Sequence, residues 1–398
     1  MKALVFERSL PRLAAARAAG ALTPGLGARL GALRLVDIEE PALPGPGWER
    51  VRPLLSGICG SDLATVDGRA SRWFEPIVSF PFVPGHELVG TAEDGRRVVV
   101  EPVLGCAARG ITPPCAACAG GDVGRCERIA FGHLAPGLQT GYCEDTGGGW
   151  GAVLVAHQSQ LHDVPDALDD AAAVMVEPAA CAVHGALAAG DVSGAVVVVL
   201  GAGTLGLCTI AALHRLALPG TVVTGAKYPD QQRLARDLGA TIAVEPGEVR
   251  RAVRRVARSL VIGDRLAGGA DIVIDCVGSA ESLEEALAVV RPRGRVVMVG
   301  MPGRVSVDLT PLWQREVELV GAYAYGVEPS LGRRTFDVAL ELVHDAGLHR
   351  LVSAAYPLDR YVEAIDHAAN AGRRGAVKVV FDQRRHGRPS SRGDGAAQ

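Results

Sequence analysis

A buried strand followed at once by a glycine-rich turn constrains the fold of this chain more than any other feature. Residues 195–200 form a continuous apolar run, which is typical of a parallel strand buried on both faces. The turn after it consists of Gly201, Ala202, Gly203, Thr204, Leu205 and Gly206. Gly201 allows a tight turn, Gly203 lets the backbone approach a pyrophosphate, and Gly206 lets the next helix pack on the strand with its N-terminus toward the phosphates. The segment therefore predicts a Rossmann dinucleotide-binding unit, and no Gly-Lys-Ser/Thr follows as a P-loop would require.

The alternation of strand and helix continues after this turn. Apolar segments at 221–224, 241–244, 271–277 and 295–300 are separated by helical segments at 230–238, 248–260 and 282–290. This order predicts a doubly wound parallel sheet and an α/β fold. The helix at 248–260 carries five arginines, which a solvated helix face explains better than a binding patch: Arg250, Arg251, Arg254, Arg255 and Arg258.

The segments on either side of this unit have a different pattern. Short strands are predicted at 2–7, 33–38, 50–55 and 151–155, among turns rich in glycine and proline, which indicates a β-rich domain. Between the first two, an Ala- and Arg-rich segment at 13–20 predicts a short surface helix without an evident role. We expect a β-rich domain over 1–178, a dinucleotide-binding domain over 179–322, a return to the first domain over 323–382 and a disordered tail over 383–398.

Composition and charge exclude several classes of function. The chain has 398 residues and a formal net charge of -3, so no basic surface predicts nucleic acid as a partner. No apolar run approaches the ~18 residues of a membrane span, and the N-terminus lacks the apolar region of a signal peptide. We therefore expect a cytoplasmic protein that does not bind membranes. Nine cysteines in such a chain favour metal or redox chemistry over a disulfide framework.

Four of the cysteines cluster in one loop, at about residues 105–127. Cys106, Cys115, Cys118 and Cys126 lie in a segment rich in Gly, Pro and Ala, which has few large apolar side chains to hold it together. Four thiolates around one tetrahedral zinc ion would supply that constraint. A closed four-cysteine site is structural because it leaves no position for a substrate. An irregular loop with free thiols is the alternative.

Two glycine-bounded turns carry a second set of metal-ligand side chains. One turn contains Cys59 and Ser61, and the other contains His86 and Glu87. Thiolate, imidazole and carboxylate together suit zinc. A cysteine and a histidine so far apart in sequence often coincide by chance, so these residues alone do not establish a metal site.

Taken together, these motifs resemble the zinc-dependent alcohol dehydrogenases of the medium-chain dehydrogenase/reductase family. The resemblance spans about residues 33–382 and includes Glu177-Pro178, a pair found in the bacterial sorbitol and threonine dehydrogenase branch. It implies a GroES-like catalytic domain interrupted by a Rossmann domain, with the active site in the cleft between them. It also implies hydride transfer between NAD(P) and an alcohol, polyol or other hydroxy compound, which interconverts the alcohol and its ketone or aldehyde.

The resemblance assigns roles to residues of the two turns. Cys59 and His86 match the first two ligands of a catalytic zinc ion. Glu87 and Glu177 match carboxylates that complete the site, although both need not bind at once. Ser61 matches the hydroxyl that hydrogen-bonds the substrate oxygen and helps to remove the proton.

The chain departs from the family pattern in the cysteine loop and beside the zinc cysteine. Cys115, Cys118 and Cys126 match three structural ligands, but Thr112 stands where the first is usual, so Cys106 is the expected substitute. Ala64 stands where many members carry a histidine that passes the proton to solvent. The relay must then be shorter, or use water or another group. The loop 141–150 is also longer and richer in glycine than expected, either as a cleft-side loop or as a surface loop.

The sequence leaves two other functions open. A zinc-independent reductase of activated double bonds on the same fold would have no use for Cys59, His86 and Glu177 together. A non-catalytic dinucleotide-binding protein would keep the fold without turnover, and Ala64 gives this alternative some support.

The residues after the strand at 221–224 bear on the choice of cofactor. Ala226 occupies the position where an NAD-preferring Rossmann domain usually carries an acidic residue, so no carboxylate repels a 2′-phosphate. Gly225-Ala226-Lys227 also resembles the Gly-Ser-Arg of NADP-dependent alcohol dehydrogenases, which places Lys227 to meet the phosphate. We expect NADP(H) to be favoured over NAD(H); the alternative is that Lys227 points into solvent and either cofactor binds. The resemblance further implies a homodimer or homotetramer formed near residues 295–309.

Overall fold

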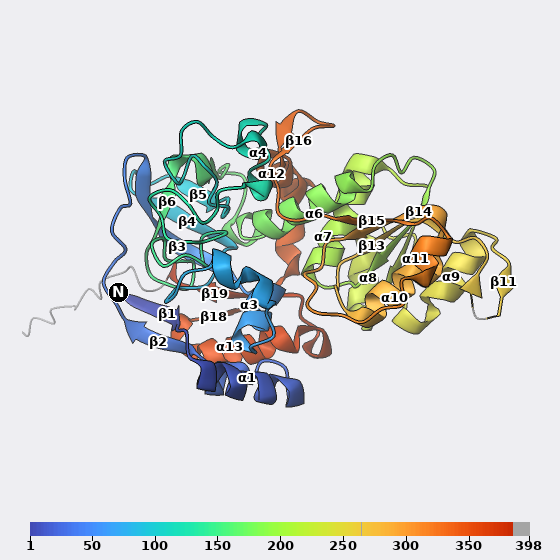
Figure 1. The fold of residues 1–398 in the computed structure, drawn as a ribbon, viewed down its shortest axis with the longest axis horizontal. Helices are drawn as coiled ribbons and strands as arrows, with labels where there is room; N and C mark the ends of the chain where they lie inside the picture. Colours follow the sequence, from blue (N-terminus) through green and yellow to red (C-terminus); the bar gives the residue numbers. More distant parts are fainter. Residues whose placement is uncertain (264, 385–398) are drawn as a thin grey trace, which may run out of the picture.

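The computed structural model describes residues 1–263 and 265–384, which form two lobes joined by helices (Figure 1). Of the predicted disordered tail, residues 385–398 lie outside the described residues. Within the described ranges, no helix is long and apolar enough to cross a membrane.

A largely antiparallel sheet of seven strands forms the core of the first lobe. Its order is β18-β19-β3-β4-β5-β7, and β6 pairs with β3. The strands are β3 (Trp48–Gly57), β4 (Leu88–Ala92), β5 (Arg97–Val100), β6 (Leu154–His157), β7 (Leu161–Asp163), β18 (Val352–Tyr356) and β19 (Lys378–Asp382). Segments from both ends of the chain therefore share one sheet, because β19 pairs directly with β3.

The second lobe is a parallel sheet of six strands in the order β10-β9-β8-β13-β14-β15. Its strands are β8 (Val196–Leu200), β9 (Thr221–Gly225), β10 (Ile242–Val244), β13 (Ala270–Asp275), β14 (Val290–Met298) and β15 (Glu318–Gly321). Its helices are α7 (Thr204–Ala212), α8 (Pro229–Asp237), α9 (Val249–Val256), α10 (Ala280–Val289) and α11 (Thr310–Gln314). Numbered within the lobe the order is 3-2-1-4-5-6, the Rossmann order. The predicted α/β fold with a doubly wound parallel sheet is confirmed.

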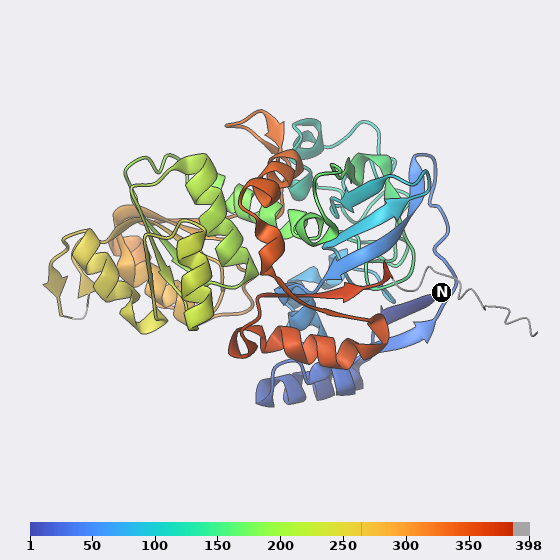
Figure 2. The same ribbon diagram turned by 180° about the vertical axis from the view of Figure 1, so that it is seen from behind.

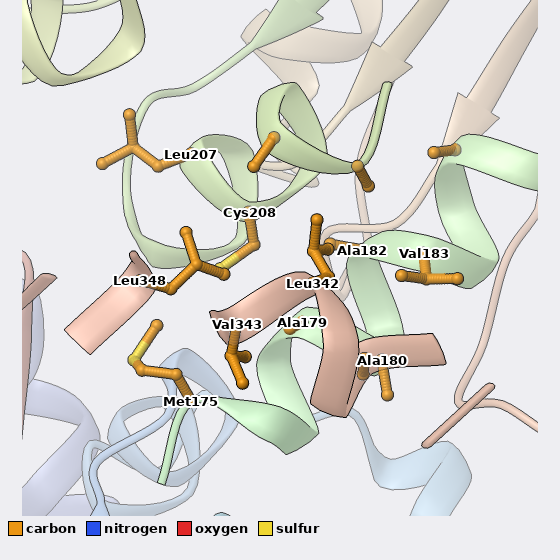
Figure 3. Close-up of a cluster of buried hydrophobic side chains, with 14 of the residues drawn as sticks. Met175, Ala179, Ala180, Ala182, Val183, Leu207, Cys208, Leu342, Val343 and Leu348 are labelled. Atoms are coloured by element: carbon orange, nitrogen blue, oxygen red, sulfur yellow. The ribbon is translucent and has the colours of Figure 1, made fainter. Parts of the chain in front are cut away.

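Three helices pack together where the lobes meet. They are α6 (Val176–Ala188), α7 and α12 (Thr335–Asp345), with the short helix α5 (Asp170–Ala173) just before α6. Figure 3 shows side chains from all three in one buried cluster, among them Met175, Ala179, Val183, Leu207, Cys208, Leu342 and Val343. Burial of apolar surface at about 25 cal/mol per Å² makes such a cluster a strong anchor for α6. This matters for the site because Glu177 lies in the first turn of α6.

The N-terminal segment contains more helix than the sequence predicted. β1 (Lys2–Phe6) pairs with β2 (Leu33–Asp37) so that Phe6 lies opposite Leu33, yet the connection contains α1 (Leu10–Leu22) and α2 (Gly27–Leu30). The connection is held by Asp67, at the end of α3 (Gly60–Val66), whose carboxylate accepts hydrogen bonds from the Gly25 and Gly27 amides at 3.0 and 3.1 Å. The segment lies beneath α13 (Tyr361–Ala369), as the view from behind shows (Figure 2).

Some predicted boundaries were wrong. The strand predicted at 151–155 begins only at Leu154, because the residues before it form a glycine-rich turn. The arginine-rich helix ends at Val256 rather than near residue 260; soon afterwards Arg258 adopts a left-handed conformation with φ of 49°, which ends a helix. A hairpin of β11 (Val261–Ile262) and β12 (Arg265–Leu266) follows. The sequence also gave no signal for α4 (Ala116–Ala119), β16 (Val327–Glu328) and β17 (Arg333–Arg334).

Candidate active site

The first turn of the site is fixed by the start of α3. Cys59 is the residue that caps α3, and its own amide donates to the Asp62 carboxylate at 2.9 Å. This reciprocal cap satisfies amides that a helix start leaves without partners. Ser61 lies in the first turn of the same helix and is half-buried.

The second turn is fixed by close packing around Gly85. Gly85 has φ of +97°, and a Cβ there would lie 2.4 Å from a ring carbon of Trp150. Only glycine fits such a position. The tight turn delivers His86 and Glu87, both buried, just before β4 begins at Leu88.

The two turns bring three predicted ligands together. Cys59, His86 and Glu87 each offer one ligand atom, and these atoms lie within 4.8 Å of one another. Glu87 also forms an ion pair with the buried Lys378 of β19, whose Nζ donates to the Ile58 carbonyl at 3.3 Å. A thiol, an imidazole and a carboxylate at this separation fit a zinc ion.

Glu177 lies close to this set but outside the group that converges within 4.8 Å. Its carboxylate accepts from the Tyr325 hydroxyl at 3.0 Å and lies 3.5 Å from the Cys181 thiol. Burial raises the pKa of Glu177 to about 7; the charge of His86 opposes this, and that of Glu87 adds to it. A buried carboxylate without a cation beside it is costly. A metal ion held by Cys59 and His86 would supply that charge, so the residues fit the metal that the sequence predicted.

Asp62 lies behind His86. The Asp62 carboxylate is 1% exposed, and its Oδ1 lies 3.5 Å from His86 Nδ1. Burial lowers the pKa of His86, but the charge of Asp62 and its contact with the ring outweigh burial and raise the pKa well above its usual value. With Nδ1 directed at Asp62, Nε2 is the nitrogen left for a metal.

The four clustered cysteines also converge. Their sulfur atoms lie within 4.8 Å of one another, with Cys106 and Cys126 at 3.8 Å and Cys115 and Cys126 at 4.0 Å. Backbone amides donate to these sulfurs, as from Cys115 to Cys106 at 3.4 Å. Such bonds stabilise thiolates, so the donor set fits a tetrahedral zinc ion. Cys106 takes part although Thr112 occupies the usual position.

The glycine-rich turn opens toward solvent beside the metal-ligand turns. Gly201 has φ of +91°, and a Cβ at Gly206 would lie 1.8 Å from the Gly201 carbonyl, whereas a Cβ at Gly203 would meet nothing within 4 Å. The open space at Gly203 fits a pyrophosphate. Thr204, which begins α7, donates from its hydroxyl to the Val377 carbonyl at 3.4 Å. Val377 directly precedes Lys378, so the glycine-rich turn contacts the residue next to the ion-pair partner of Glu87.

The two residues predicted to determine the preference between NADP and NAD differ in their exposure to solvent. Ala226 is fully buried and its amide donates to the Val244 carbonyl at 2.7 Å. Lys227 is exposed, with Nζ 6.0 Å from the centroid of the Tyr228 ring. No ion pair of Lys227 occurs among the residues that the structure describes.

Sequence reasoning missed several residues that hold the site: Asp62, Tyr142, Tyr325 and Lys378. Lys378 could have been noticed in the sequence, since it is a lone charge within an otherwise apolar run at residues 376–381. Tyr142 and Tyr325 gave no such signal, because their partners lie 80 and 148 residues away in sequence. The loop 141–150 is mostly buried, which contradicts the surface-loop alternative for this segment.

Comparison with known proteins agrees with this geometry. The alcohol dehydrogenase GroES-like domain matches residues 45–166, and the zinc-binding dehydrogenase domain matches residues 204–345. The L-idonate 5-dehydrogenase of Vitis vinifera is 28% identical over 377 residues, covering 88% of this chain and 92% of that protein. The sorbitol dehydrogenase of Halalkalibacterium halodurans is 27% identical over 363 residues, covering 86% and 94%.

Solved structures give the same result. A protein from Sinorhizobium meliloti assigned as a zinc-binding dehydrogenase, crystallised with NADP, is 27% identical with a TM-score of 0.66 and covers 88% of this chain and 95% of that one. The alcohol dehydrogenase of Thermus sp. ATN1 is 25% identical with a TM-score of 0.70, covering 96% and 99%. This chain belongs to the zinc-dependent alcohol dehydrogenases of the medium-chain dehydrogenase/reductase family, in the branch of the sorbitol, idonate and threonine dehydrogenases, enzymes that transfer hydride between an alcohol and a nicotinamide cofactor.

Proposed function

We propose that this enzyme oxidises a secondary alcohol of a polyol or hydroxy acid, and reduces the matching ketone, with Cys59 and His86 holding a catalytic zinc ion. The observation that carries the proposal is the convergence of Cys59, His86 and Glu87 within 4.8 Å. The polyol and sugar-acid dehydrogenases among its relatives support this substrate class. A zinc ion bound there would act as a Lewis acid on the substrate oxygen.

The protein's own residues prepare the site for this chemistry. Glu177 is the carboxylate that completes the ligand set, because Glu87 already has a cationic partner in Lys378. Ser61, half-buried in the first turn of α3, would accept the proton of the substrate hydroxyl while its own hydroxyl proton leaves to water. The turn at Gly203 and the N-terminus of α7 bind the pyrophosphate of the cofactor.

A broad turnover screen tests this function. Purified enzyme reconstituted with zinc is assayed against simple alcohols, polyols and hydroxy acids, and against their carbonyl products, with both NADP and NAD. Hydride transfer to a polyol or hydroxy acid supports the proposal. Transfer only to activated double bonds, independent of zinc, would show the zinc-independent reductase, and no transfer to any compound would show a non-catalytic dinucleotide-binding protein.

The second part of the proposal is a preference for NADP(H), set by Lys227. The exposed ammonium group and the absence of a carboxylate at Ala226 support it. A charge pair at 4 Å contributes about 4 kcal/mol at an effective dielectric near 20, and less when exposed. We expect a preference of roughly one to two decades in kcat/KM, which Lys227→Ala should remove. An unmutated enzyme that prefers NAD, or a mutant with an unchanged ratio, overturns this part.

The third part concerns stoichiometry and assembly. Two separate ligand sets support two zinc ions per chain, one catalytic and one held by the four cysteines. Exposed apolar side chains on and beside α11, including Leu309 at 55% and Trp313 at 78%, support a homodimer or homotetramer formed near the outer edge of the parallel sheet. Metal analysis and light scattering test the two statements; one zinc ion per chain, or a mass near 41.3 kDa, would contradict them.

A further inference from the structure

Tyr142 lies directly behind the proposed metal site, in the loop 141–150. Its side chain is buried, and its ring lies 5.2 Å from the Phe82 ring and 5.9 Å from the His86 imidazole, measured between centroids. The ring thus packs beside the imidazole of His86, tilted by 46° to it. The hydroxyl of this residue takes no part in the proposed hydride transfer or metal binding.

The hydroxyl of Tyr142 has two polar neighbours. It lies 3.3 Å from Asp62 Oδ1 and 3.4 Å from the Thr65 hydroxyl. Thr65 has a single proton, which it donates to the Ser61 carbonyl at 2.9 Å. In its contact with Asp62 the Tyr142 hydroxyl is the donor, because an ionised carboxylate only accepts hydrogen bonds.

Asp62 connects this hydroxyl to both turns of the site. One carboxylate oxygen accepts from the Cys59 amide at 2.9 Å, and the other faces His86 Nδ1 at 3.5 Å. The bond to Cys59 has the ordinary length of an amide hydrogen bond, whereas the 3.5 Å contact leaves His86 Nδ1 without a hydrogen-bond partner among the described residues. The oxygen that faces His86 is the one that Tyr142 contacts, so Tyr142 determines where that oxygen points.

We infer that Tyr142 is a positioning residue, which holds Asp62 so that the proton of His86 stays on Nδ1 and Nε2 remains available to the catalytic zinc. The inference rests on the proposed function of Cys59 and His86 as ligands. Groups that orient a metal-bound histidine through its second nitrogen typically change metal affinity or activity by about 10- to 100-fold when they are removed. Tyr142 lies one contact further from the metal than Asp62 does. Its hydroxyl contacts Asp62, and its ring packs beside the imidazole of His86.

The test is Tyr142→Phe, which removes one hydroxyl and keeps the ring against Phe82 and His86. The catalytic zinc is identified as the ion that Cys59→Ser lacks, and its loss to a chelator is followed in the purified full-length enzyme. We expect Tyr142→Phe to release this zinc about 10-fold faster than the wild type, with kcat lowered and KM for the alcohol little changed. The d–d absorption of the cobalt-substituted site should also shift, since the orientation of the imidazole changes.

The chain offers a matched control in Tyr356→Phe. The Tyr356 hydroxyl lies 2.9 Å from His367 Nδ1, so Tyr356 is a second tyrosine that contacts a histidine; it is half-buried and lies on β18, away from the ligand set. Its removal should affect stability without affecting zinc release or the cobalt spectrum. Zinc release from Tyr142→Phe equal to that from Tyr356→Phe would overturn the inference.

A double mutant separates positioning from general packing. In an Asp62→Asn background, Tyr142→Phe should change zinc release little further, because its effect passes through the carboxylate. Full additivity of the two substitutions would contradict the inference. If Cys59→Ser leaves the zinc content of the enzyme unchanged, the proposed function fails instead, which is a distinct result.

Discussion

The two candidate metal-ligand sets of this protein differ in what holds their residues in place. The four cysteines lie in the loop at residues 105–127, which we call the cysteine lobe. Beyond the cysteines themselves, this lobe has few apolar contacts: Ile111, Ala117 and Ile129. Cys59, His86 and Glu87 instead lie where α3, β4 and β19 meet, with the buried Asp62 and Lys378 as charged partners. Metal would therefore stabilise the fold in the first set, whereas in the second set the fold arranges ligands for a metal.

The largest effect is expected from replacing a ligand of the second set, which should abolish most of the turnover. Cys59→Ser should lower kcat/KM by about 10³-fold or more, because a Lewis acid contributes several kcal/mol to the transition state. The free energy of unfolding should change by no more than about 1 kcal/mol, since the turn is held by α3 and its cap. Steady-state kinetics and chemical denaturation measure the two quantities. A folded Cys59→Ser enzyme with wild-type turnover would contradict the assignment, and His86→Gln should behave as Cys59→Ser does.

The next largest effect is expected from replacing a cysteine of the first set, which should lower the stability of the fold. Cys118→Ser should cost about 4 kcal/mol of unfolding free energy and one zinc ion, because metal binding in such a lobe is folding free energy. Turnover per folded molecule should stay within a few-fold of the wild type. Cys143→Ala is the matched control: its thiol is buried nearby but outside the cluster, and its zinc content should not change. An unchanged zinc content after replacement of all four cysteines would refute the structural site.

Sequence patterns predicted the residues that converge in the two clusters better than the residues that support them. Local motifs indicate candidate ligands, because a cysteine in a glycine-rich turn can be recognised from the residues next to it in the sequence. The parallel sheet was predictable for the same reason, since its strands are uninterrupted apolar runs. Supports such as Tyr325 and Lys378 come from distant segments, and the α1–α2 connection has no periodic signal strong enough to give its length. The sequence could not show which carboxylate Lys378 would neutralise.

An intermediate effect is expected from replacing a residue that supports the cysteine lobe but is not a metal ligand. Arg109 is fully buried, and its guanidinium donates to the carbonyls of Leu104, Phe131 and Gly137 at 3.0, 3.0 and 2.6 Å. Arg109→Met should cost about 3 kcal/mol, because it leaves buried carbonyls without donors. The protein should nevertheless keep its full zinc content. Arg125→Met, at a residue whose side chain is 77% exposed, is the control and should cost at most about 0.5 kcal/mol.

Loss of zinc from Arg109→Met at the same stability as the wild type would reverse this interpretation. It would mean that Arg109 serves the metal, by balancing the charge of the thiolates, and not the carbonyls of the lobe. Metal analysis together with denaturation distinguishes the two results.

The smallest expected effect lies where the two sets meet. β16 contacts the cysteine lobe through the Val327 amide, which donates to the Gly121 carbonyl at 3.0 Å, and it follows Tyr325, which holds Glu177. Glu328 fixes this segment: it is 3% exposed, and its carboxylate contacts His184 of α6 at 2.9 Å and Thr335 at 2.7 Å. Burial alone would raise the pKa of Glu328, but its hydrogen bonds with His184 and Thr335 lower it below the usual 4.5.

A carboxyl whose pKa is lower in the folded state stabilises the fold above its unfolded pKa, and this contribution is lost as pH falls through the folded value. We therefore expect Glu328→Gln to cost about 1–2 kcal/mol near neutral pH, as for a hydrogen-bonded buried charge. The difference from the wild type should shrink as the pH falls below 4.5. Denaturation of both proteins across this range measures it. A difference that stays constant on acidification would show that the neutral amide merely packs less well, so that the contact between the two ligand sets does not depend on the charge of Glu328.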